Sequence, residues 1–576
     1  MKKWLAYPLA LSLLLTAGCT AQYTTEEPTE KETKPTASQV DADMFTDRDH
    51  KTQYSEGKSV RIQLNGDTAE AKADTVHIDG STVTITGSDT YILSGSLDGS
   101  IIIDAGEKGK PQLVLEGVTV QSETNAVNIQ EADKVFITLA EGTENSLSAT
   151  EAAVYSKQDL TFNGLGTLTA ASTADHAITC KDDLVFTGGS YQIRSASHGL
   201  DANDSIRITG DTTMTVEAGK DGIHCENQDN SDVGFVYVEK GSLKITAQGD
   251  GISAGAYAHI VDGSFDITAG GGSVNGSKEH SDFFGGFMGG GRPARPRAAQ
   301  STTTEESTSM KGLKAEGNVT IENGSFVMDT ADDTVHSNQT ITVNGGVFEL
   351  SSGDDAFHAE ETLTIQAGII NVKTSYEALE AHKVYVRAGV FELHAKDDGI
   401  NAAGGQDNSG TTGGRDAMFG GGRPGGPFGG GSSDGLIEIS GGELKIYSSG
   451  DGMDANGSIK VTGGDLYVTN PTSGDTSVLD SDNGAVITGG SFIGAAASTM
   501  MAHSFDGSST QGVIAVTVGS QKAGTEVTVT DDAGNTLISF EAEYDFVLVI
   551  LSTPELTKGE TYTMTVGTMT DTVQAT

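Results

Sequence analysis

The chain has 576 residues, among them 76 glycines and only 10 prolines, and its 80 acidic against 35 basic side chains give a net charge of −45. Such a field repels nucleic acid and anionic lipid surfaces, so it excludes nucleic-acid binding and favours cations as partners. No GxGxxG or P-loop stretch follows an expected strand and opens a helix, so the sequence does not indicate a nucleotide cofactor.

Residues 1–18 have the features of an export signal. Lys2 and Lys3 precede an apolar run that is too short to span a bilayer permanently, and the segment ends in LTAGC at residues 15–19. This ending resembles the lipobox of bacterial lipoproteins, which implies cleavage before Cys19 and lipidation of its sulfur. Residues 19–57 then correspond to the lipidated cysteine and a disordered tether. We therefore expect an exported lipoprotein, anchored to a membrane through Cys19 on the extracellular or cell-envelope face; the alternative is a secretory signal with a chance cysteine.

Residues 58–509 are dominated by a repeat of about 22 residues. Val335, Phe357, Leu379 and Ile400 occupy the same position of the repeat at intervals of 22, 22 and 21, and Ile178, Leu200 and Ile223 extend the series toward the N-terminus. Between these positions the chain shows short alternating apolar runs separated by Gly-Gly or Ala-Gly, which is typical of strands joined at corners. Three short strands per repeat and no helical segment predict an all-β fold, a right-handed single-stranded parallel β-helix.

Two residues after each apolar position stands a small residue, which predicts a second inward-facing column. Cys180 and Cys225 both fall in this column, with Ala202 between them. At roughly 4.8 Å per turn they would lie about 9.6 Å apart, beyond the reach of a disulfide. We expect two buried free thiols.

Two stretches and both ends depart from the repeat. The segments near 270–310 and 403–434 are glycine-rich, each contains GGGRP, and they are expected to be mobile insertions on one face of the solenoid. Residues 58–150 are irregular but strand-rich and are expected to cap the N-terminal end. Residues 510–576 lose the repeat and are expected to form a small β-sandwich or C-terminal cap, because a bare end turn would expose unpaired backbone groups.

Ionisable residues recur at two further positions of the repeat. The corner position before each apolar residue is acidic, and the acidic residues there and next to it are Asp221, Asp250, Asp332, Asp333, Asp354, Asp355, Glu377, Asp397, Asp398 and Asp451. The position directly after the apolar residue alternates away from the core and is expected to form an outward line of glycan-binding candidates, namely His224, Lys314, His336, His358, Glu380, Asn401 and Asp454.

Stacked carboxylates repel one another unless a cation bridges them, and oxygen-rich clusters of this kind suit Ca²⁺. The competing explanation is that Asp favours turns and bonds its own backbone there, which accounts for a single Asp better than for the doublets at 332–333, 354–355 and 397–398. We expect Ca²⁺ at some of these turns. His336 and His358 would also be close enough to share a transition metal, but no third nitrogen or sulfur ligand is evident beside them, so Zn²⁺ is the lesser hypothesis.

The stretches DGIHCENQDNSD, GDGISAGA, MKGLKAEG, DDTVHSN, DDAFHAE, SYEALEA and DDGINAAGG resemble a family of bacterial surface β-helix proteins. Members are carbohydrate-binding, calcium-associated proteins related in fold to pectate lyases. The resemblance covers most of residues 58–500 and implies a noncatalytic β-helix that binds polygalacturonate-like or cellulosic polysaccharide with Ca²⁺. It transfers no defined ligand set, and DDTVHSN, DDAFHAE and SYEALEA depart mildly from the family pattern.

Three functions remain open from the sequence. The leading one is binding of an acidic polysaccharide at the cell surface by a monomer. The second is a Ca²⁺-dependent polysaccharide lyase, which needs a cationic base to take the C5 proton of a uronate; Lys311, Lys314, Lys383 and Arg387 are the candidates, and none lies in a recognisable signature. The third is a structural adhesin, in which the polar ladders only stabilise the solenoid.

Overall fold

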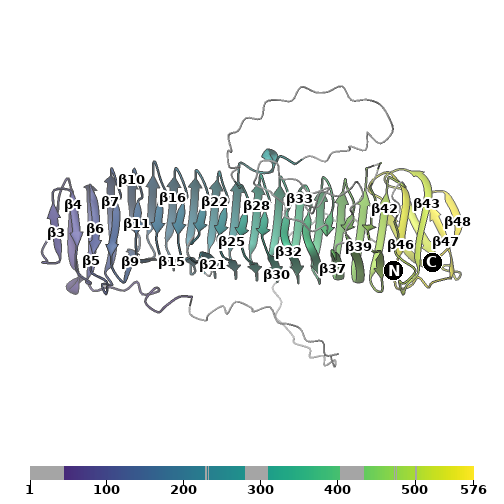
Figure 1. The fold of residues 1–576 in the computed structure, drawn as a ribbon, viewed down its shortest axis with the longest axis horizontal. Helices are drawn as coiled ribbons and strands as arrows, with labels where there is room; N and C mark the ends of the chain where they lie inside the picture. The colour runs from purple at the N-terminus through teal and green to yellow at the C-terminus, as the bar shows by residue number, and fades with distance from the viewer. Residues whose placement is uncertain are drawn as a thin grey trace, which may run out of the picture.

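The computed structural model describes residues 44–576 except 228–229, 231–232, 279–308, 403–433, 473, 475 and 500–502. Figure 1 shows an elongated stack of turns that runs from the purple N-terminal end to the yellow C-terminal end. Successive turns pair in parallel, so the chain is a parallel β-helix, as the repeat predicts. The described residues contain only two short 3-10 helices, η1 (Glu56–Lys58) and η2 (Ser273–Asn275). None of their helices is long and apolar enough to cross a membrane.

Strands of successive turns form three parallel sheets along the molecule. The first sheet carries the apolar column of the repeat and contains β4 (Thr82–Ile85), β6 (Ser100–Asp104), β8 (Val127–Glu131), β11 (Val154–Ser156), β14 (Ile178–Cys180), β17 (Leu200–Ala202), β20 (Ile223–Cys225), β23 (Ile252–Ala254), β26 (Leu313–Ala315), β29 (Val335–Ser337), β32 (Phe357–Ile365), β34 (Leu379–Val386), β36 (Ile400–Ala402), β38 (Met453–Ala455) and β40 (Asp480–Ser481). Some strands bend at a corner and pair in two sheets; β32 and β34 are examples.

The second sheet contains β9 (Lys134–Leu139), β12 (Asp159–Gly164), β15 (Asp183–Phe186), β18 (Ser205–Ile208), β21 (Phe235–Val238), β24 (Ala258–Ile260), β27 (Val319–Ile321), β30 (Thr340–Val343) and β41 (Ala485–Ile487), with parts of β32, β34, β37 (Leu436–Ser448) and β39 (Ser458–Asn470). The third sheet contains β10 (Glu144–Ala149), β13 (Thr167–Ser172), β16 (Ser190–Ser195), β19 (Thr213–Ala218), β22 (Ser242–Ala247), β25 (Ser264–Ala269), β28 (Ser325–Thr330), β31 (Val347–Ser352), β33 (Ile369–Thr374), β35 (Val390–Ala395) and β42 (Ser491–Ala496), with the remainder of β37 and β39.

The N-terminal end is closed by antiparallel pairing. Strand β2 (Ala69–Ala71) pairs antiparallel with β1 (Val60–Gly66), and β3 (Val76–Asp79) pairs antiparallel with β4. From β5 (Thr90–Asp98) and β7 (Gln112–Ser122) onward the pairing is parallel. The cap is therefore confined to the first four strands and is shorter than the expected span of 58–150.

Residues 44–54, which the sequence assigned to the tether, pack against the side of the solenoid instead. Asp49 is buried; its carboxylate accepts a hydrogen bond from Thr161 Oγ1 at 2.6 Å and lies 2.9 Å from Lys134 Nζ. The Arg207 guanidinium donates to the carbonyl of Met44 at 2.9 Å. Polar composition alone misidentified this segment because its partners come from turns more than 80 residues away. The signal peptide, Cys19 and residues 19–43 lie outside the described residues.

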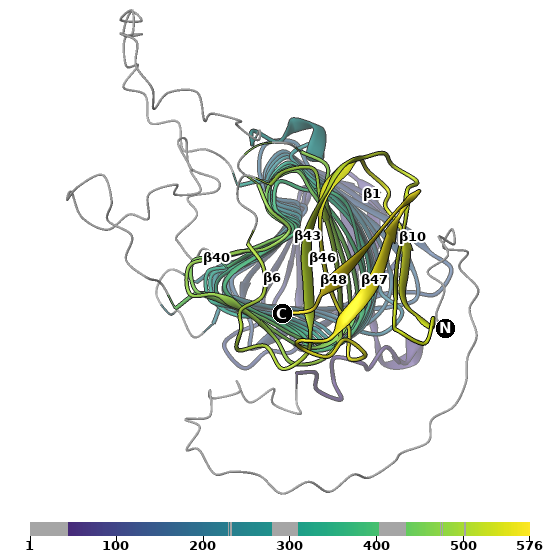
Figure 2. The same ribbon diagram turned by 90° about the vertical axis from the view of Figure 1, so that its right-hand side faces the viewer.

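The C-terminal end is covered by a small β-sandwich, as expected. Strand β46 (Phe546–Ser552) pairs antiparallel with β42 at the end of the solenoid and with β43 (Val513–Gln521). A second sheet has the order β45 (Thr536–Glu541), β44 (Glu526–Thr530), β47 (Thr561–Val566) and β48 (Met569–Gln574). Figure 2, viewed along the solenoid, shows these strands lying across its end, and a separate apolar cluster fills the space beneath them.

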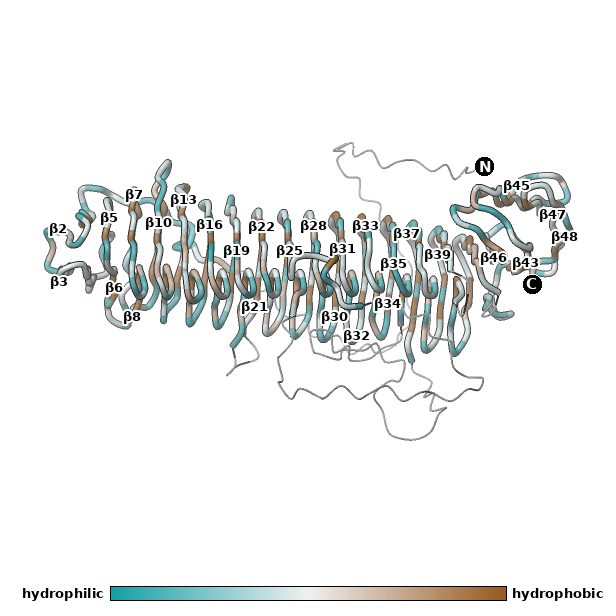
Figure 3. Tube along the Cα trace, turned by 90° about the horizontal axis from the view of Figure 1, so that it is seen from above, coloured by the Kyte–Doolittle hydropathy of each residue, from teal (hydrophilic) through white to brown (hydrophobic). Residues whose placement is uncertain are grey.

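The predicted apolar column is continuous. Val335 pairs with Phe357, Phe357 with Leu379 and Leu379 with Ile400, and all four are completely buried. The register also continues across both glycine-rich segments, since β23 pairs with β26 and β36 with β38. In Figure 3 hydrophobic residues recur at the same place in turn after turn.

The predicted inward column of small residues is also present. Cys180 and Cys225 are buried free thiols, each paired in register with Ala202 between them. The corners likewise require a small residue. Gly346 has a φ of 110°, and a Cβ there would lie 3.1 Å from the carbonyl oxygen of Gly324 one turn below.

Candidate functional site

The recurring corner aspartates have a common backbone role. In each case one carboxylate oxygen accepts the N–H of the corner residue one turn further on. The acceptor–donor pairs are Asp221–Asp250, Asp250–Lys311, Asp333–Asp355, Asp355–Glu377, Asp398–Asp451 and Asp451–Ser477. These aspartates therefore bond the backbone of the next turn rather than that of their own corner, which explains why Asp returns once per turn. Differences in chemistry along the ladder come from what their second oxygens contact.

The position after the apolar residue also forms a continuous ladder in the first sheet. Its members pair in register in the order Thr179, Asp201, His224, Ser253, Lys314, His336, His358, Glu380, Asn401, Asp454 and Asp480. This polar column and the corner aspartates divide along the axis into three clusters that differ in the side chains surrounding the carboxylates.

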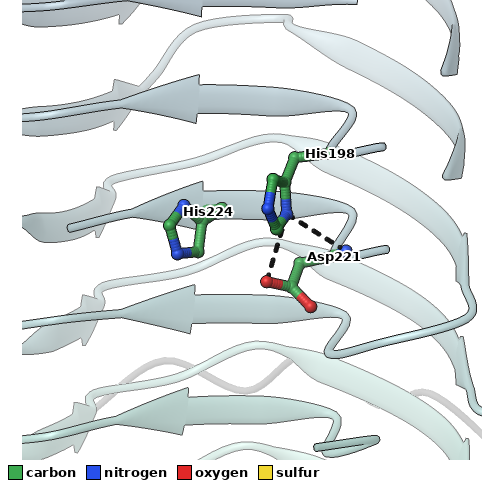
Figure 4. Close-up of side chains that lie close together, drawn as sticks. All are labelled: His198, Asp221 and His224. Atoms are coloured by element: carbon green, nitrogen blue, oxygen red, sulfur yellow. Dashed lines mark hydrogen bonds and ion pairs between the residues drawn. The ribbon is translucent and has the colours of Figure 1, made fainter. Parts of the chain in front are cut away.

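The first, the histidine cluster, consists of His176, His198, His224, Asp201 and Asp221. The three imidazoles stack on successive turns, with ring centroids 4.9 Å and 4.3 Å apart. Figure 4 shows Asp221 beside His198, with its Oδ2 atom 3.2 Å from His198 Nδ1. His224 Nδ1 lies 3.1 Å from Asp201 Oδ1. Asp201 is buried, but His176, His198, His224 and Asp221 are only partly buried, so the cluster is open to solvent.

Carboxylates set the charge of this cluster. Burial lowers the pKa of His224, but its hydrogen bond to Asp201 and the charges of Asp221, Asp201 and Glu226 outweigh it, so the pKa of His224 is raised. At His176 burial dominates and the pKa is lowered. Burial raises the pKa of Asp221, but His198 outweighs it and the net shift is downward.

The second cluster, the buried lysine network, occupies the turns where the sequence predicts Ca²⁺. Lys311 is 2 % exposed, and its Nζ lies 3.0 Å from Asp332 Oδ2 and 2.8 Å from Asp333 Oδ2. Lys278 Nζ lies 3.1 Å from Asp354 Oδ1. Burial lowers the pKa of Lys311, but the two aspartates outweigh it and raise it. Lys311 and Lys278 thus place ammonium groups beside Asp332, Asp333 and Asp354, whose carboxylate oxygens also lie within 4.8 Å of one another; Ca²⁺ at these turns stays a prediction.

The glycan-binding candidates of this region are covered rather than exposed. His336, His358, Glu380 and Asn401 are between 1 % and 8 % exposed, so a polymer does not reach them. They do point away from the core, but the corner preceding each strand folds over them: His336 Nδ1 lies 2.8 Å from Asp333 Oδ2, three residues earlier. The alternation predicted their direction correctly and their exposure wrongly, because a strand pattern contains no information about the corners.

Ion pairs and hydrogen bonds link neighbouring buried groups inside the network. His358 Nδ1 lies 2.6 Å from Glu380 Oε2 and 3.2 Å from Asp355 Oδ2, and Asn401 Nδ2 donates to Glu377 Oε1 at 2.9 Å. Burial lowers the pKa of His358, but Glu380 and Asp355 outweigh it and raise it. Burial likewise raises the pKa of Glu380, but the charge of His358 and its hydrogen bond to Glu380 outweigh burial and lower the pKa to about 2. Ion pairs and hydrogen bonds therefore connect His358 to Glu380 and Asp355, and Asn401 to Glu377, inside the network.

The third, the aspartate cluster, consists of Asp397, Asp398, Asp451 and Asp454, which are partly exposed. Burial and the neighbouring carboxylates raise the pKa of Asp451 to about 8 and that of Asp454 to about 7. No lysine or arginine of the described residues pairs with Asp398, Asp451 or Asp454. Oδ1 atoms of both Asp397 and Asp398 face the same point over Gly450, where a Cβ would collide with them. Its donor set of carboxylate oxygens fits Ca²⁺.

A hollow of about 630 Å³ lies at the C-terminal ends of β13, β16, β19 and β22. It is lined by Ser172, Thr173, Arg194, Ser195, Ala196, Glu217, Ala218, Thr246 and Gln248, and the exposed Arg194–Glu217 pair, 3.1 Å apart, lies on it. The corner loops that line it also carry the histidine cluster, since His198 follows Ala196 and Asp221 follows Ala218. The hollow spans four turns.

The proposed lyase bases are all engaged with carboxylates. Lys314 Nζ lies 3.3 Å from Glu316, Lys383 Nζ lies 3.0 Å from Asp434, and Arg387 pairs with Glu438. The pKa of Lys383 is raised by its hydrogen bond to Asp434 and that of Lys311 is raised within its network, which opposes the neutral amine that a base requires.

Sequence reasoning missed several residues of these clusters. His176 and His198 stand two residues before Ile178 and Leu200, at the position where other turns carry the corner aspartate, so the repeat contained the signal. No sequence pattern indicated Lys278. The segment that precedes it crosses to another turn, where the backbone N–H of Ser273 donates to Asp329 Oδ1 at 2.7 Å.

Comparison with known proteins gives a family match and two similar proteins. A family model described as "Carbohydrate-binding domain-containing protein" matches residues 79–356 and 354–536. A protein of the same description from Acetivibrio thermocellus is 31% identical over 232 residues, which cover 38% of this chain and 81% of that protein. A solved structure of a polysaccharide lyase-like protein from C. thermocellum, a gadolinium derivative, is 30% identical with a TM-score of 0.36 and covers 37% of this chain and 92% of that one. The chain belongs to the family of carbohydrate-binding domain-containing proteins.

Proposed function

We propose that the protein is a noncatalytic, cell-surface polysaccharide-binding lipoprotein that holds an acidic glycan of the polygalacturonate type through Ca²⁺ at the aspartate cluster. Family membership supports a carbohydrate partner. The finer proposal depends on one observation: Asp398, Asp451 and Asp454 lie near other carboxylates, and no lysine or arginine of the described residues pairs with these three, whereas Lys311 and Lys278 pair with the aspartates of the buried lysine network.

Ca²⁺ explains how a chain of net charge −45 retains a polyanion. Ca²⁺ takes six to eight oxygen ligands, and a few aspartates on a solenoid corner do not complete such a set. Uronate carboxylates of the glycan supply the remaining oxygens, so the ion bridges two surfaces that otherwise repel each other. Asp398, Asp451 and Asp454 are the residues that would hold the ion, and Arg194 in the hollow offers a direct contact for a further uronate.

Attachment to the cell follows from the N-terminal sequence. The lipobox-like LTAGC segment supports export and lipidation at Cys19, and the intervening residues give the solenoid reach from the membrane. An elongated monomer held in this way presents its long side to a polymer.

The test is retention of the protein on polygalacturonate with Ca²⁺ and with excess chelator, compared with a neutral glycan. We expect Ca²⁺-dependent retention on the acidic glycan and no unsaturated product absorbing in the ultraviolet. Product formation would make the protein a lyase. Equal retention with and without Ca²⁺ would refute the bridging ion. Absence of retention on any glycan would refute polysaccharide binding and favour the structural adhesin.

Two substitutions locate the ion. Asp398→Asn and Asp451→Asn keep an oxygen that can accept the backbone N–H of the next turn, so the corner is preserved while the charge is lost. We expect the double variant to lower Ca²⁺-dependent affinity for polygalacturonate about tenfold or more. The matched control is Asp266→Asn, an exposed aspartate on β25 that pairs with Lys244. A loss of the same size in the control would assign the effect to net charge.

A further inference from the structure

The histidine cluster has the composition and spacing of a transition-metal site. Potential ligand atoms of His198, Asp221 and His224 all lie within 4.8 Å of one another. Figure 4 shows the two imidazoles side by side with the Asp221 carboxylate below them, the rings inclined by only 19°. We propose that His198, His224 and Asp221 bind a divalent transition metal of the Zn²⁺ class.

The separation of the ligand atoms is close to what a metal requires. Zn²⁺ bound at about 2.0–2.2 Å in tetrahedral geometry places its ligand atoms roughly 3.4 Å apart. His198 Nδ1 and Asp221 Oδ2 are already 3.2 Å apart; Nδ1 also accepts the backbone N–H of Asp221 at 3.3 Å, a hydrogen bond that a metal ion at Nδ1 would replace. Because the ligand atoms lie within 4.8 Å of one another, a ring nitrogen of His224 completes the set after a side-chain movement of at most about 1.4 Å.

Neighbouring carboxylates hold the His224 ring in place. Its Nδ1 lies 3.1 Å from Asp201 Oδ1 and its Nε2 lies 3.4 Å from Glu226 Oε2. Whichever nitrogen binds the metal, the other has a carboxylate acceptor for its proton, and this pairing fixes ring orientation and raises ligand basicity in metal sites. Asp201 is itself paired with Lys181 at 3.2 Å, so it is positioned independently of the imidazole.

Accessibility distinguishes this cluster from the other histidine–carboxylate groups. The sets Asp333–His336–His358 and Asp355–His358–Glu380 also have convergent ligand atoms, but they are buried, and Lys311 adds a fixed positive charge to the first. Side chains of His198, Asp221 and His224 are 13 %, 15 % and 21 % exposed, which leaves a path for an ion and a fourth coordination position for water or a ligand oxygen.

The donor set selects the metal. Two imidazole nitrogens and one carboxylate suit Zn²⁺, Co²⁺, Ni²⁺ or Cu²⁺, whereas Ca²⁺ prefers oxygen ligands throughout. This site is separate from the aspartate cluster in sequence, position and ligand type. Its occupancy therefore does not depend on the proposed glycan-binding function.

The experiment is a calorimetric titration of the purified protein with Zn²⁺ in millimolar Ca²⁺, with Co²⁺ absorption as a second readout. We expect one saturable Zn²⁺ per chain that Ca²⁺ does not displace, and Co²⁺ bands of a tetrahedral site. Absence of saturable Zn²⁺ binding, or its displacement by Ca²⁺, would overturn the proposal.

Variants assign the ligands. His198→Ala should weaken Zn²⁺ binding at least tenfold and abolish the Co²⁺ bands. Asp221→Asn keeps an acceptor for the Asp250 N–H, preserves the corner, and should weaken binding about tenfold without a change in melting temperature. The matched control His394→Ala removes a histidine that stacks on Tyr447 elsewhere in the solenoid and should bind as the unmodified chain does. Undiminished Zn²⁺ binding in both His198→Ala and Asp221→Asn would place the metal elsewhere and refute the site.

Discussion

The chemistry of each corner aspartate depends on its second carboxylate oxygen. The first oxygen accepts a backbone N–H of the next turn at Asp221, Asp333 and Asp398 alike. The second contacts an imidazole at Asp221 and the Lys311 ammonium at Asp333, while Asp398 is surrounded by other carboxylates that raise its pKa. One structural bond therefore accommodates three different electrostatic environments.

Lys311 provides a direct test of the buried lysine network. Lys311→Met keeps the bulk of the side chain but leaves the Asp332 and Asp333 carboxylates buried without their cation, so we expect a loss of about 3–5 kcal/mol in the free energy of unfolding. Lys314→Met, which removes a partly exposed ammonium paired only with Glu316, should cost less than about 1 kcal/mol. Urea denaturation measures both; equal, small effects would mean that the network contributes little.

Asp49 makes the attachment of residues 44–54 pH-dependent. Burial raises its pKa, but the hydrogen bond from Thr161 and the charge of Lys134 outweigh it and lower the pKa to about 2. A carboxylate with a depressed pKa stabilises the fold above its unfolded pKa of roughly 4 and loses that contribution as the pH falls through about 2. We expect Asp49→Asn to cost about 2 kcal/mol at pH 7 and little near pH 2. Thermal unfolding at both values checks this, and a pH-independent difference would contradict it.

At the scale of elements, one turn of three strands is the unit of the fold. A turn buries its apolar residues only against its neighbours, as the parallel stack of Phe265, Phe326 and Phe348 shows, with centroids 4.8 Å and 4.6 Å apart. Phe357 lies edge-on to Phe348 at 5.6 Å and joins the apolar column to this stack.

Removal of Phe357 should therefore act locally. Phe357→Ala leaves a cavity in a fully buried position and should cost about 3–5 kcal/mol. Hydrogen exchange should accelerate in the turns around β29, β32 and β34 and remain slow near the C-terminal cap, because each turn contacts only its neighbours. Val347→Ala, at a 39 % exposed position of the adjoining strand, is the control and should change neither quantity appreciably. Uniform acceleration along the chain would indicate a single cooperative unit instead.

At the scale of the whole molecule, net charge controls the long-range electrostatic interaction with the proposed acidic glycan. With a net charge of −45, the chain repels an acidic glycan at long range, and salt screens this repulsion within a Debye length of about 10 Å at 0.1 M.

Ionic strength should therefore have opposite effects with and without Ca²⁺. In chelator, raising NaCl should increase the weak association with polygalacturonate because it screens repulsion. With Ca²⁺ present, the same salt should weaken association because it screens the bridging ion. Biolayer interferometry on immobilised polygalacturonate measures both rates. If NaCl changed the association in the same direction with chelator and with Ca²⁺, the ion would not convert the repulsion into an attraction.

The sequence alone determined the solenoid, its register and its buried thiols. A parallel stack repeats the same contacts at every turn, so Val335, Phe357 and Leu379 follow from spacing without knowledge of any distant partner. The aspartate corners were predictable for the same reason. Even the missed His198 occupied a position that the repeat defines.

Tertiary structure decided which ladder residues are available for binding. Exposure and charge compensation depend on contacts between segments that no local pattern relates, such as Lys278 reaching Asp354 and Asp49 reaching Thr161. Aspartates at equivalent positions therefore form ion pairs with buried lysines at one set of turns, whereas Asp398, Asp451 and Asp454 at another set pair with no lysine or arginine of the described residues. Spacing along the chain determines whether a side chain points toward or away from the core. Its burial and the charge of the residues that contact it are properties of the assembled turns.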